Sequence, residues 1–426
     1  MRRLASRAAG FVRSQPVLCC AFAAAVLSQV VSPQGAQVAG LIDWQVIGLL
    51  ACFMVCTAAL QQANALSWLA FRLVRGDMSL STLMLSLVLL PFFASMVVTN
   101  DVALLAFVPF ACAVLRASGE QRLVVPVLVL QTLAANMGSM ATPFGNPQNL
   151  LLFKGFGLDA AEFFVVVIPY VGLSFVLIVV FCLVAGRYRA VKPFCGQLPL
   201  VDVRKTAAAG VLFALCVATV FDVVPLSMTL VCAVVFALAC DGIELLRSRE
   251  CLVVMSDKGG KPLQGRGREQ NETVSSDGGG PLRKRECGDV VSGSTLIIAR
   301  IDYALLLTFA CFFVFSGTLA ASDAVRQVLS GALSEHPFLI PLAASQVISN
   351  VPAAALLMPF ATSWQQLVLG VDIGGLGTPV ASLASLITLG IYRKEGCGST
   401  ARFLRAFLLA NAALLAANCA LWLLLS

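Results

Sequence analysis

The sequence predicts an all-α polytopic membrane protein composed of two inverted repeats, each with a re-entrant hairpin and a broken transmembrane helix. Three observations lead to this fold class. Apolar residues make up 59% of the 426 residues and charged residues 12%, whereas soluble domains carry about 25% charged residues. The apolar residues form many runs long enough for helical spans, rather than the short alternating strands of a barrel. Polar motifs interrupt these runs and recur in the same order in both halves of the chain.

The composition excludes several classes of protein. Because part of any folded surface stays wet, a soluble enzyme of this size could not cover so much apolar surface, and a disordered or fibrous chain is excluded as well. The fifteen cysteines form no Cys-x-x-Cys pair, and His336 is the single histidine, which excludes a multi-histidine metal site. The formal charge is +7, but the basic residues flank apolar runs, so no nucleic-acid partner is expected.

Helical spans of about 20 apolar residues can be placed along the chain in order. Nine full crossings are expected, at 17–33, 43–60, 121–153, 161–186, 205–221, 223–246, 302–320, 364–392 and 403–425. The basic residues before the first crossing resemble the start of a signal peptide. No clear cleavage site follows, so we expect an uncleaved first span, with a cleaved signal as the alternative. Segments 61–76 and 321–333 are weaker and are expected along the membrane interface.

The positions of Arg and Lys orient these spans, because basic loops stay in the cytoplasm. They predict a cytoplasmic N-terminus and an external C-terminus. Both ends of the apolar region 80–116 carry basic residues, so this hairpin enters and leaves from the cytoplasmic side. Both ends of 336–363 are poor in basic residues, so this hairpin enters from outside.

The domain organisation follows from the spans and from one polar interruption. Residues 247–300 are rich in Gly and charged residues and predict a disordered cytoplasmic linker between two membrane halves. The predicted units are an N-terminal span (1–42), a first repeat (43–186) with hairpin 80–116 and broken helix 121–153, connecting spans (187–246), the linker (247–300), and a second, inverted repeat (301–426) with hairpin 336–363 and broken helix 364–392.

Two pairs of motifs carry the repeat. The hairpin tips match at a constant offset, from Thr99-Asn100-Asp101 to Ser349-Asn350-Val351. A second pair follows in the same order, with Thr142-Pro143 in the first half and Thr378-Pro379 in the second. Inverted repeats with broken helices near the middle of the bilayer are typical of secondary transporters, because two similar halves can expose one central site to either side in turn.

These motifs have the chemistry of an ion and anion site. Proline and glycine unwind a helix, which exposes carbonyl oxygens that can hold Na⁺ and N–H groups that favour anions. A lone Asn or Ser in a membrane helix is more often a contact between helices. Asn146, Gln148, Asn149 and Ser382 could equally cap a broken helix. The predicted site residues are Thr99, Asn100, Asp101, Thr142, Pro143, Gly145, Asn146, Ser349, Asn350, Thr378, Pro379 and Ser382, with Na⁺ expected at Thr99, Asn100, Ser349 and Asn350.

Asp101 is the carboxylate expected deep in a hairpin. Carboxylates within a membrane are costly and therefore indicate function, so Asp101 is predicted to bind a cation or a proton. A cap on the following half-helix is the structural alternative. Asp43, Asp222 and Asp372 lie nearer the ends of predicted spans and are expected at the interface.

The motifs resemble those of the ion-transporter superfamily, which includes arsenite permeases, citrate transporters, NhaD-type sodium/proton antiporters and sodium–dicarboxylate symporters. Residues about 40–425 share the likeness, and the bacterial anion permeases beside the arsenite permeases are most similar. The resemblance implies two inverted repeats, a homodimer, elevator-type movement, and hairpin tips that hold Na⁺ and substrate. Asp101 and Val351 stand where the dicarboxylate members have Thr, which favours the arsenite-permease side.

We therefore predict a secondary active transporter of the inner membrane that moves a small anion or oxyanion, coupled to Na⁺ or H⁺. No cofactor is expected apart from a coupling ion. The alternative within the same class is a Na⁺/H⁺ antiporter with Asp101 as the titrating group. A membrane enzyme is not expected, because the sequence has no paired carboxylates, His-based metal site or Ser/Lys dyad at membrane depth.

Overall fold

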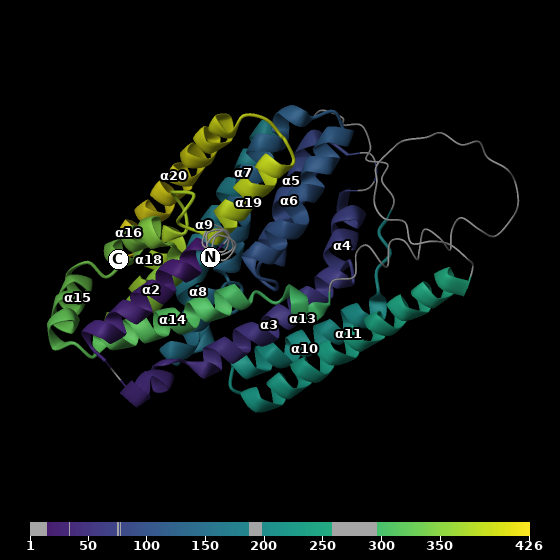
Figure 1. The fold of residues 1–426 in the computed structure, drawn as a ribbon. Coiled ribbons are helices and arrows are strands. Elements are labelled where there is room, and N and C mark those ends of the chain that lie inside the picture. The colour runs from purple at the N-terminus through teal and green to yellow at the C-terminus, as the bar shows by residue number, and fades with distance from the viewer. Residues whose placement is uncertain (1–14, 34, 75, 77, 187–197, 258–295) are drawn as a thin grey trace, which may run out of the picture.

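The computed structural model describes residues 15–33, 35–74, 76, 78–186, 198–257 and 296–426, and this part of the chain is predominantly helical (Figure 1). Among the described residues, eight helices are long and apolar enough to cross a membrane. They are Trp44–Gln62, Asn100–Ala117, Gln121–Ser139, Ala160–Ala185, Val203–Val220, Leu226–Leu246, Tyr303–Ala320 and Thr400–Leu425. The prediction of an all-α polytopic membrane protein is confirmed.

The same order of helices occurs twice. Each series begins with a long helix and a short one, continues with two helices that meet at a tip and two that flank a break, and ends with a long helix. The first series is α3 (Trp44–Gln62), α4 (Ala65–Val74), α5 (Leu80–Ala94), α6 (Asn100–Ala117), α7 (Val124–Ser139), α8 (Pro147–Gly155) and α9 (Ala160–Gly186). The second is α14 (Tyr303–Ala320), α15 (Asp323–Glu335), α16 (Leu339–Ile348), α17 (Asn350–Leu357), α18 (Trp364–Gly374), α19 (Leu383–Lys394) and α20 (Thr400–Leu425).

Other helices precede, join or extend these two series. They are α2 (Pro16–Val31), η1 (Gly35–Leu41), η2 (Gln121–Leu123), α10 (Val203–Val220), α11 (Leu226–Asp257), α13 (Ile297–Arg300) and η3 (Met358–Phe360). The first predicted crossing, 17–33, corresponds to α2, which is shorter than the eight candidate spans. The predicted crossing 364–392 is divided between α18 and α19, because the chain unwinds at 375–382.

Aspartates start the first long helix of each series. The Asp43 carboxylate accepts the backbone N–H groups of Gln45 and Val46, each at 3.0 Å. The Asp302 carboxylate accepts the backbone N–H of Leu305 at 2.9 Å. Such N-caps satisfy helix N–H groups that have no partner within the helix.

Contacts between the two series come in reciprocal pairs. Helix α6 contacts α19, and its counterpart α17 contacts α8. Helix α7 contacts both α19 and α20, and its counterpart α18 contacts both α8 and α9. Reciprocal contacts of this kind are what a two-fold relation between similar units produces. The direction in which each series crosses the bilayer, and the re-entrance of the hairpins, stay predictions.

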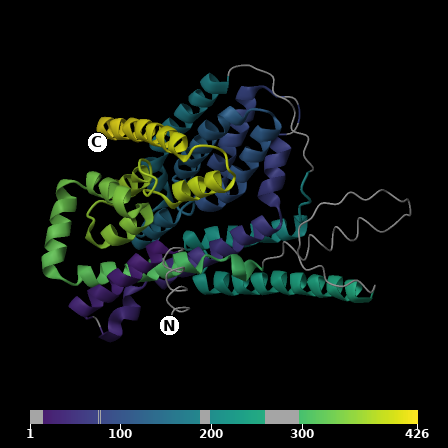
Figure 2. The same cartoon turned by 45° about the horizontal axis from the view of Figure 1, so that its top comes forward.

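Helices α2, α10 and α11 pack on the first long helices of the two series, along one side of the structure. Helices α10 and α11 lie side by side and both contact α3, while α14 packs lengthwise on α2 (Figures 1 and 2). On the other side, α5, α6, α7 and α19 form a bundle (Figure 1). The bundle therefore contains both hairpin and broken-helix segments.

Helices occupy both ends of the range predicted as a linker, 247–300. Helix α11 continues to Asp257, and α13 begins at Ile297. The Asp241 carboxylate, on α11, accepts the backbone N–H of Ile297 at 2.6 Å and that of Ile298 at 3.2 Å. Helical structure thus shortens the predicted linker at both ends. Its centre, 258–295, lies outside the described residues.

Two glycines at matching positions let each broken helix pack against its hairpin. A Cβ added to Gly138 of α7 would meet the backbone oxygen of Phe92, on α5. A Cβ added to Gly374 of α18 would lie 2.8 Å from the Ser345 Cβ and 3.0 Å from the Leu342 Cα, on α16. Backbone atoms cannot move away as a flexible side chain can, so these positions require glycine.

We expect Gly138→Ala and Gly374→Ala each to lower stability by about 1–3 kcal/mol, the usual cost of overpacking. The measurement is thermal unfolding of the purified protein in detergent. Gly172→Ala in α9 and Gly390→Ala in α19 are matched controls, because a Cβ at either position meets nothing within 4 Å. Equal melting temperatures for all four variants would contradict the close packing.

Candidate functional site

The first hairpin tip and the second break meet at one buried asparagine. Asn136 lies on α7, and its Oδ1 accepts a hydrogen bond from the Asn100 Nδ2 at 3.1 Å. The same oxygen accepts a hydrogen bond from the Ser382 Oγ at 3.0 Å. All three side chains are buried. A residue of each half thus bonds to the same atom.

The second hairpin tip reaches the same break through the backbone. The Asn350 N–H donates to the carbonyl oxygen of Ala381 at 2.9 Å, and the Ser349 hydroxyl donates to it at 3.3 Å. Ser349 has φ +77°, a left-handed conformation that is costly for a residue with a side chain. Both tips therefore converge on residues 381 and 382.

The two tip asparagines make the same local contact. The Oδ1 of Asn100 accepts the backbone N–H of Asp101, and the Oδ1 of Asn350 accepts that of Val351, each at 2.9 Å. The asparagines are the first residues of α6 and α17. Each tip thereby presents the N-terminus of a helix, where the backbone dipoles favour negative charge.

The threonines of the Thr-Pro pairs tie each break to the hairpin of its own half. The Thr142 hydroxyl donates to the carbonyl oxygen of Met96 at 2.9 Å. The Thr378 hydroxyl donates to the carbonyl oxygen of Gln346 at 3.0 Å. Met96 and Gln346 each precede the tip Thr99 or Ser349 by three residues. The two hydroxyls thus have the same structural role, which is to hold backbone in place.

The remaining predicted residues of the breaks shape the backbone. A Cβ on Gly145 would lie 2.8 Å from the Thr142 Oγ1 and 2.9 Å from the Ser139 Cα, so the turn closes only with glycine. Pro143 lies buried in the first break, and Pro379 is half-buried in the second. Proline cannot donate a backbone hydrogen bond, which fits the interruption of both helices.

Asn146 has two roles. Its Oδ1 accepts the backbone N–H of Asn149 at 2.8 Å, which caps the start of α8. Its Nδ2 points to the other half and lies 3.3 Å from the Asp372 Oδ1. Asn149 supports the first break, because its Nδ2 donates to the carbonyl oxygens of Met140 and Thr142 at 3.2 and 3.3 Å.

The expectation that Asp372 lies at the interface is wrong. This residue is 5% exposed in α18, and its Oδ1 also accepts a hydrogen bond from the Gln148 Nε2 at 3.0 Å. Helix α18 ends at Gly374, in the middle of the predicted crossing 364–392. Asp372 therefore lies beside an internal break. A signal was present in the sequence, because Asp372 precedes Thr378 by six residues as Asn136 precedes Thr142.

The polar contacts between the halves are therefore reciprocal at the level of side chains. Asn146 follows Thr142 by four residues and donates to Asp372, while Ser382 follows Thr378 by four residues and donates to Asn136. Sequence reasoning singled out Asn146 and Ser382 but missed their acceptors. Asn136 and Asp372 lie within helices, and their equal spacing to Thr142 and Thr378 is the sequence signal that could have marked them.

Several polar atoms at the site have no hydrogen-bond partner among the described residues. Asp101 is partly exposed as a residue, yet its Oδ1 is buried and unpaired. The other unpaired atoms beside the breaks are the Asn136 Nδ2, the Asn149 Oδ1, the Asp372 Oδ2 and the Ser385 Oγ. Thr99 is half-buried, and its side chain does not cap α6. Buried polar atoms without partners are uncommon in native proteins and indicate capacity for a ligand or ion.

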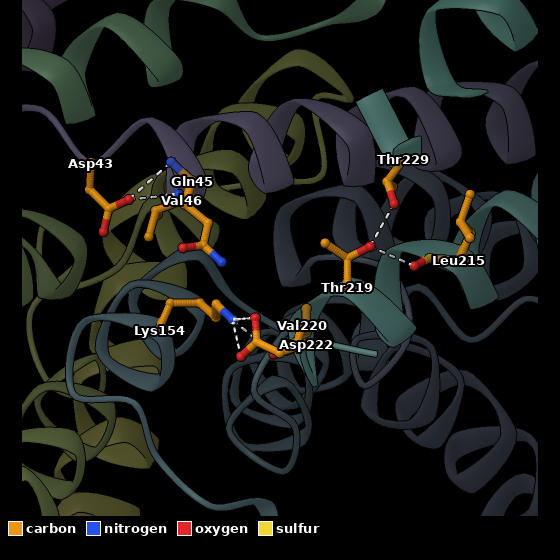
Figure 3. A network of polar contacts seen from close by, with 9 residues as sticks. All are labelled: Asp43, Gln45, Val46, Lys154, Leu215, Thr219, Val220, Asp222 and Thr229. Carbon is orange, nitrogen blue, oxygen red and sulfur yellow. Dashed lines mark hydrogen bonds and ion pairs between the residues drawn. The ribbon is translucent and has the colours of Figure 1, made fainter. Parts of the chain in front are cut away.

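An ion pair anchors the helix that carries Asn146 and Gln148. The Lys154 Nζ, at the end of α8, lies 2.7 and 2.8 Å from the two carboxylate oxygens of Asp222 and donates to the carbonyl oxygen of Val220 at 3.2 Å (Figure 3). The Lys154 side chain is 7% exposed and that of Asp222 73%. The contact ties α8 to the turn between α10 and α11, and a Thr219–Thr229 hydroxyl contact of 2.5 Å joins those two helices nearby (Figure 3).

The chain matches the citrate transporter family over residues 6–255. It is 27% identical to inner membrane protein YbiR of Escherichia coli, with 82% of this chain and 80% of that protein covered. It is 23% identical to the uncharacterized transporter MJ0456 of Methanocaldococcus jannaschii, with 85% of each chain covered.

A shorter match of 29% identity relates it to the putative transporter arsB of Dictyostelium discoideum, over 31% of this chain and 23% of that protein. The family match covers more than half of the sequence, and the helical, multi-span fold agrees with it. The chain belongs to the citrate transporter family and is a multi-pass membrane transporter.

Proposed function

We propose that this transporter is a secondary active carrier that moves a small anion, a carboxylate or an oxyanion, by alternating access coupled to Na⁺ or H⁺. The observation that carries the proposal is the convergence of both hairpin tips on the second break. Asn100 reaches Ser382 through Asn136, and Asn350 bonds directly to Ala381. One polar site is thus built from both halves.

The reciprocal contacts support alternating access. Each half contributes a hairpin, a break and the helices that flank it, and each break faces the other half. Two units that use equivalent surfaces against each other can exchange conformations with similar energies, which would open the site to either side in turn. Elevator-type movement within a homodimer is the form of this exchange that the family resemblance implies.

An anion can be held here without a positively charged side chain. The sequences from Thr99 to Asp101, from Thr142 to Asn149 and from Thr378 to Ser382 contain no Lys or Arg. Four helix N-termini lie at the tips and breaks, those of α6, α8, α17 and α19. The positive ends of their backbone dipoles and the neighbouring hydroxyls are suited to carboxylate or oxyanion oxygens.

The oxygen-rich tips are suited to a cation. We propose Na⁺ binding at Thr99 and Asn100 in the first half and at Ser349 and Asn350 in the second, through amide, hydroxyl and carbonyl oxygens. Citrate, which the family name gives, and arsenite, the solute of the similar permeases, are the two probes of substrate class. An inner-membrane location with the N-terminus in the cytoplasm completes the proposal.

A Na⁺/H⁺ antiporter is the second candidate. The observation that favours it is the buried, unpaired Oδ1 of Asp101 at the first tip. A carboxylate in this position could exchange a sodium ion for a proton. This candidate requires no anion, which separates it from the first.

We expect Asn100→Ala and Asn350→Ala each to reduce uptake of labelled citrate or arsenite into proteoliposomes by roughly 10-fold or more, since loss of a buried hydrogen-bonding group costs about 1–3 kcal/mol. The matched control is Asn418→Ala, which removes a buried amide bonded to the Ser174 Oγ at 3.0 Å, away from the tips. Unchanged uptake in both tip variants, with normal insertion, would overturn the site.

We expect a sodium gradient alone to move no protons in proteoliposomes that contain an entrapped pH-sensitive dye. Under the carrier proposal, ion movement requires the anion, so any proton movement that the dye reports requires added citrate or arsenite. Sodium-driven proton movement without an anion, abolished by Asp101→Asn, would establish the antiporter instead.

A further inference from the structure

The carboxyl group of Asp372 is buried between the two halves with only one of its oxygens satisfied. Oδ1 accepts hydrogen bonds from the Gln148 Nε2 at 3.0 Å and the Asn146 Nδ2 at 3.3 Å. Oδ2 is buried and has no hydrogen-bond partner among the described residues. An ionised carboxylate would normally draw a donor or a cation to each oxygen.

No positive charge in the described part of the chain is paired with this carboxylate. Of the helices that contact α18, helices α7, α16 and α17 contain no charged residue. The charged residues of the others, α8, α9 and α20, are Lys154, Glu162, Arg402 and Arg405. Lys154 is bound to Asp222, and the other three are exposed. A buried carboxylate without a counter-charge is strongly destabilised, and the neutral, protonated form avoids this cost.

The matching position of the other half shows which form the site accommodates. Asn136 has the same shape as a protonated aspartate, and its Oδ1 also accepts two hydrogen bonds, from Asn100 and Ser382. Its Nδ2 is buried and unpaired, as is the Asp372 Oδ2. With a proton on Oδ2, Asp372 is the neutral counterpart of Asn136. Without the proton, one negative charge distinguishes the two halves at their contact.

We propose that Asp372 binds and releases the coupling proton of this transporter, an inference that rests on the proposed function and names its coupling ion. Oδ2 takes a proton from hydronium in one compartment, leaving water, and returns it to water in the other. Asn146 and Gln148 position the carboxyl group by holding Oδ1. A proton suits this place better than Na⁺, because the two side chains that bond to Oδ1 present N–H donors, whereas hard cations require several oxygen ligands.

The first test needs no substrate. Infrared difference spectra between acidic and alkaline pH are recorded on the full-length protein in lipid, where a protonated carboxyl group gives its own C=O band. We expect a titrating band that disappears in Asp372→Asn and returns, shifted, in Asp372→Glu. The matched control is Asp159→Asn, an exposed carboxylate that caps α9 and should leave the band unchanged. A spectrum that Asp372→Asn does not alter overturns the proposal.

The second test measures proton coupling. Citrate added to proteoliposomes with an entrapped pH-sensitive dye should move protons with wild-type protein and with Asp159→Asn, and the response should fall at least 10-fold in Asp372→Asn. A full response in Asp372→Asn overturns the proposal. If wild-type protein moves no solute yet the infrared band depends on Asp372, the proposed function fails while Asp372 keeps its proton site.

Discussion

The structure depends on the need to pair backbone N–H and C=O groups at two helix breaks that lie inside an apolar protein. An unwound helix leaves N–H and C=O groups without their usual partners, and a bilayer offers no water to replace them. Each break is therefore closed by other segments. Thr142 and Thr378 bind the backbone before the hairpin tips, and Ala381 accepts the Asn350 N–H. The hairpins and the breaks thus supply hydrogen-bond partners for one another's backbone.

The two halves share a framework but differ in charge. Threonine, asparagine and glycine recur at matching positions because they make the same contacts with the backbone in each half. Aspartate does not recur: Asp101 is matched by Val351, and Asp372 by Asn136. At its tip or break each half thus has one carboxyl group with a buried, unpaired oxygen, at a different place in each half, so symmetric movement can be combined with asymmetric binding of ions. Lys154 and Asp222 fix α8 outside this centre and keep Asn146 and Gln148 directed towards the second half.

Much of the fold and part of the site could be predicted from local sequence. The polar tips at Asn100 and Asn350 and the Thr-Pro pairs interrupt apolar runs. Such an interruption can be recognised in the sequence without knowing which residues it contacts. Asn136 and Asp372 are different, because they lie in the last turns of α7 and α18, before the breaks, and acquire their importance only from Ser382 and Asn146 across the contact. The broken helix 364–392 was predicted, with its break at Thr378-Pro379, but Asp372 was placed near a membrane surface because its distance from the other half cannot be read from local sequence.

The sequence alone determined that this chain is a helical membrane protein with two similar halves, because hydrophobic runs and helix-breaking residues act over a few turns of helix. Tertiary structure decided which polar atoms are paired across the halves and which, like the Asp372 Oδ2, are left without a partner. Hydrogen bonds and burial depend on the distance between segments more than two hundred residues apart in the chain. Composition and periodicity contain no information on that distance, so the position of a buried charge emerges only when the chain is folded.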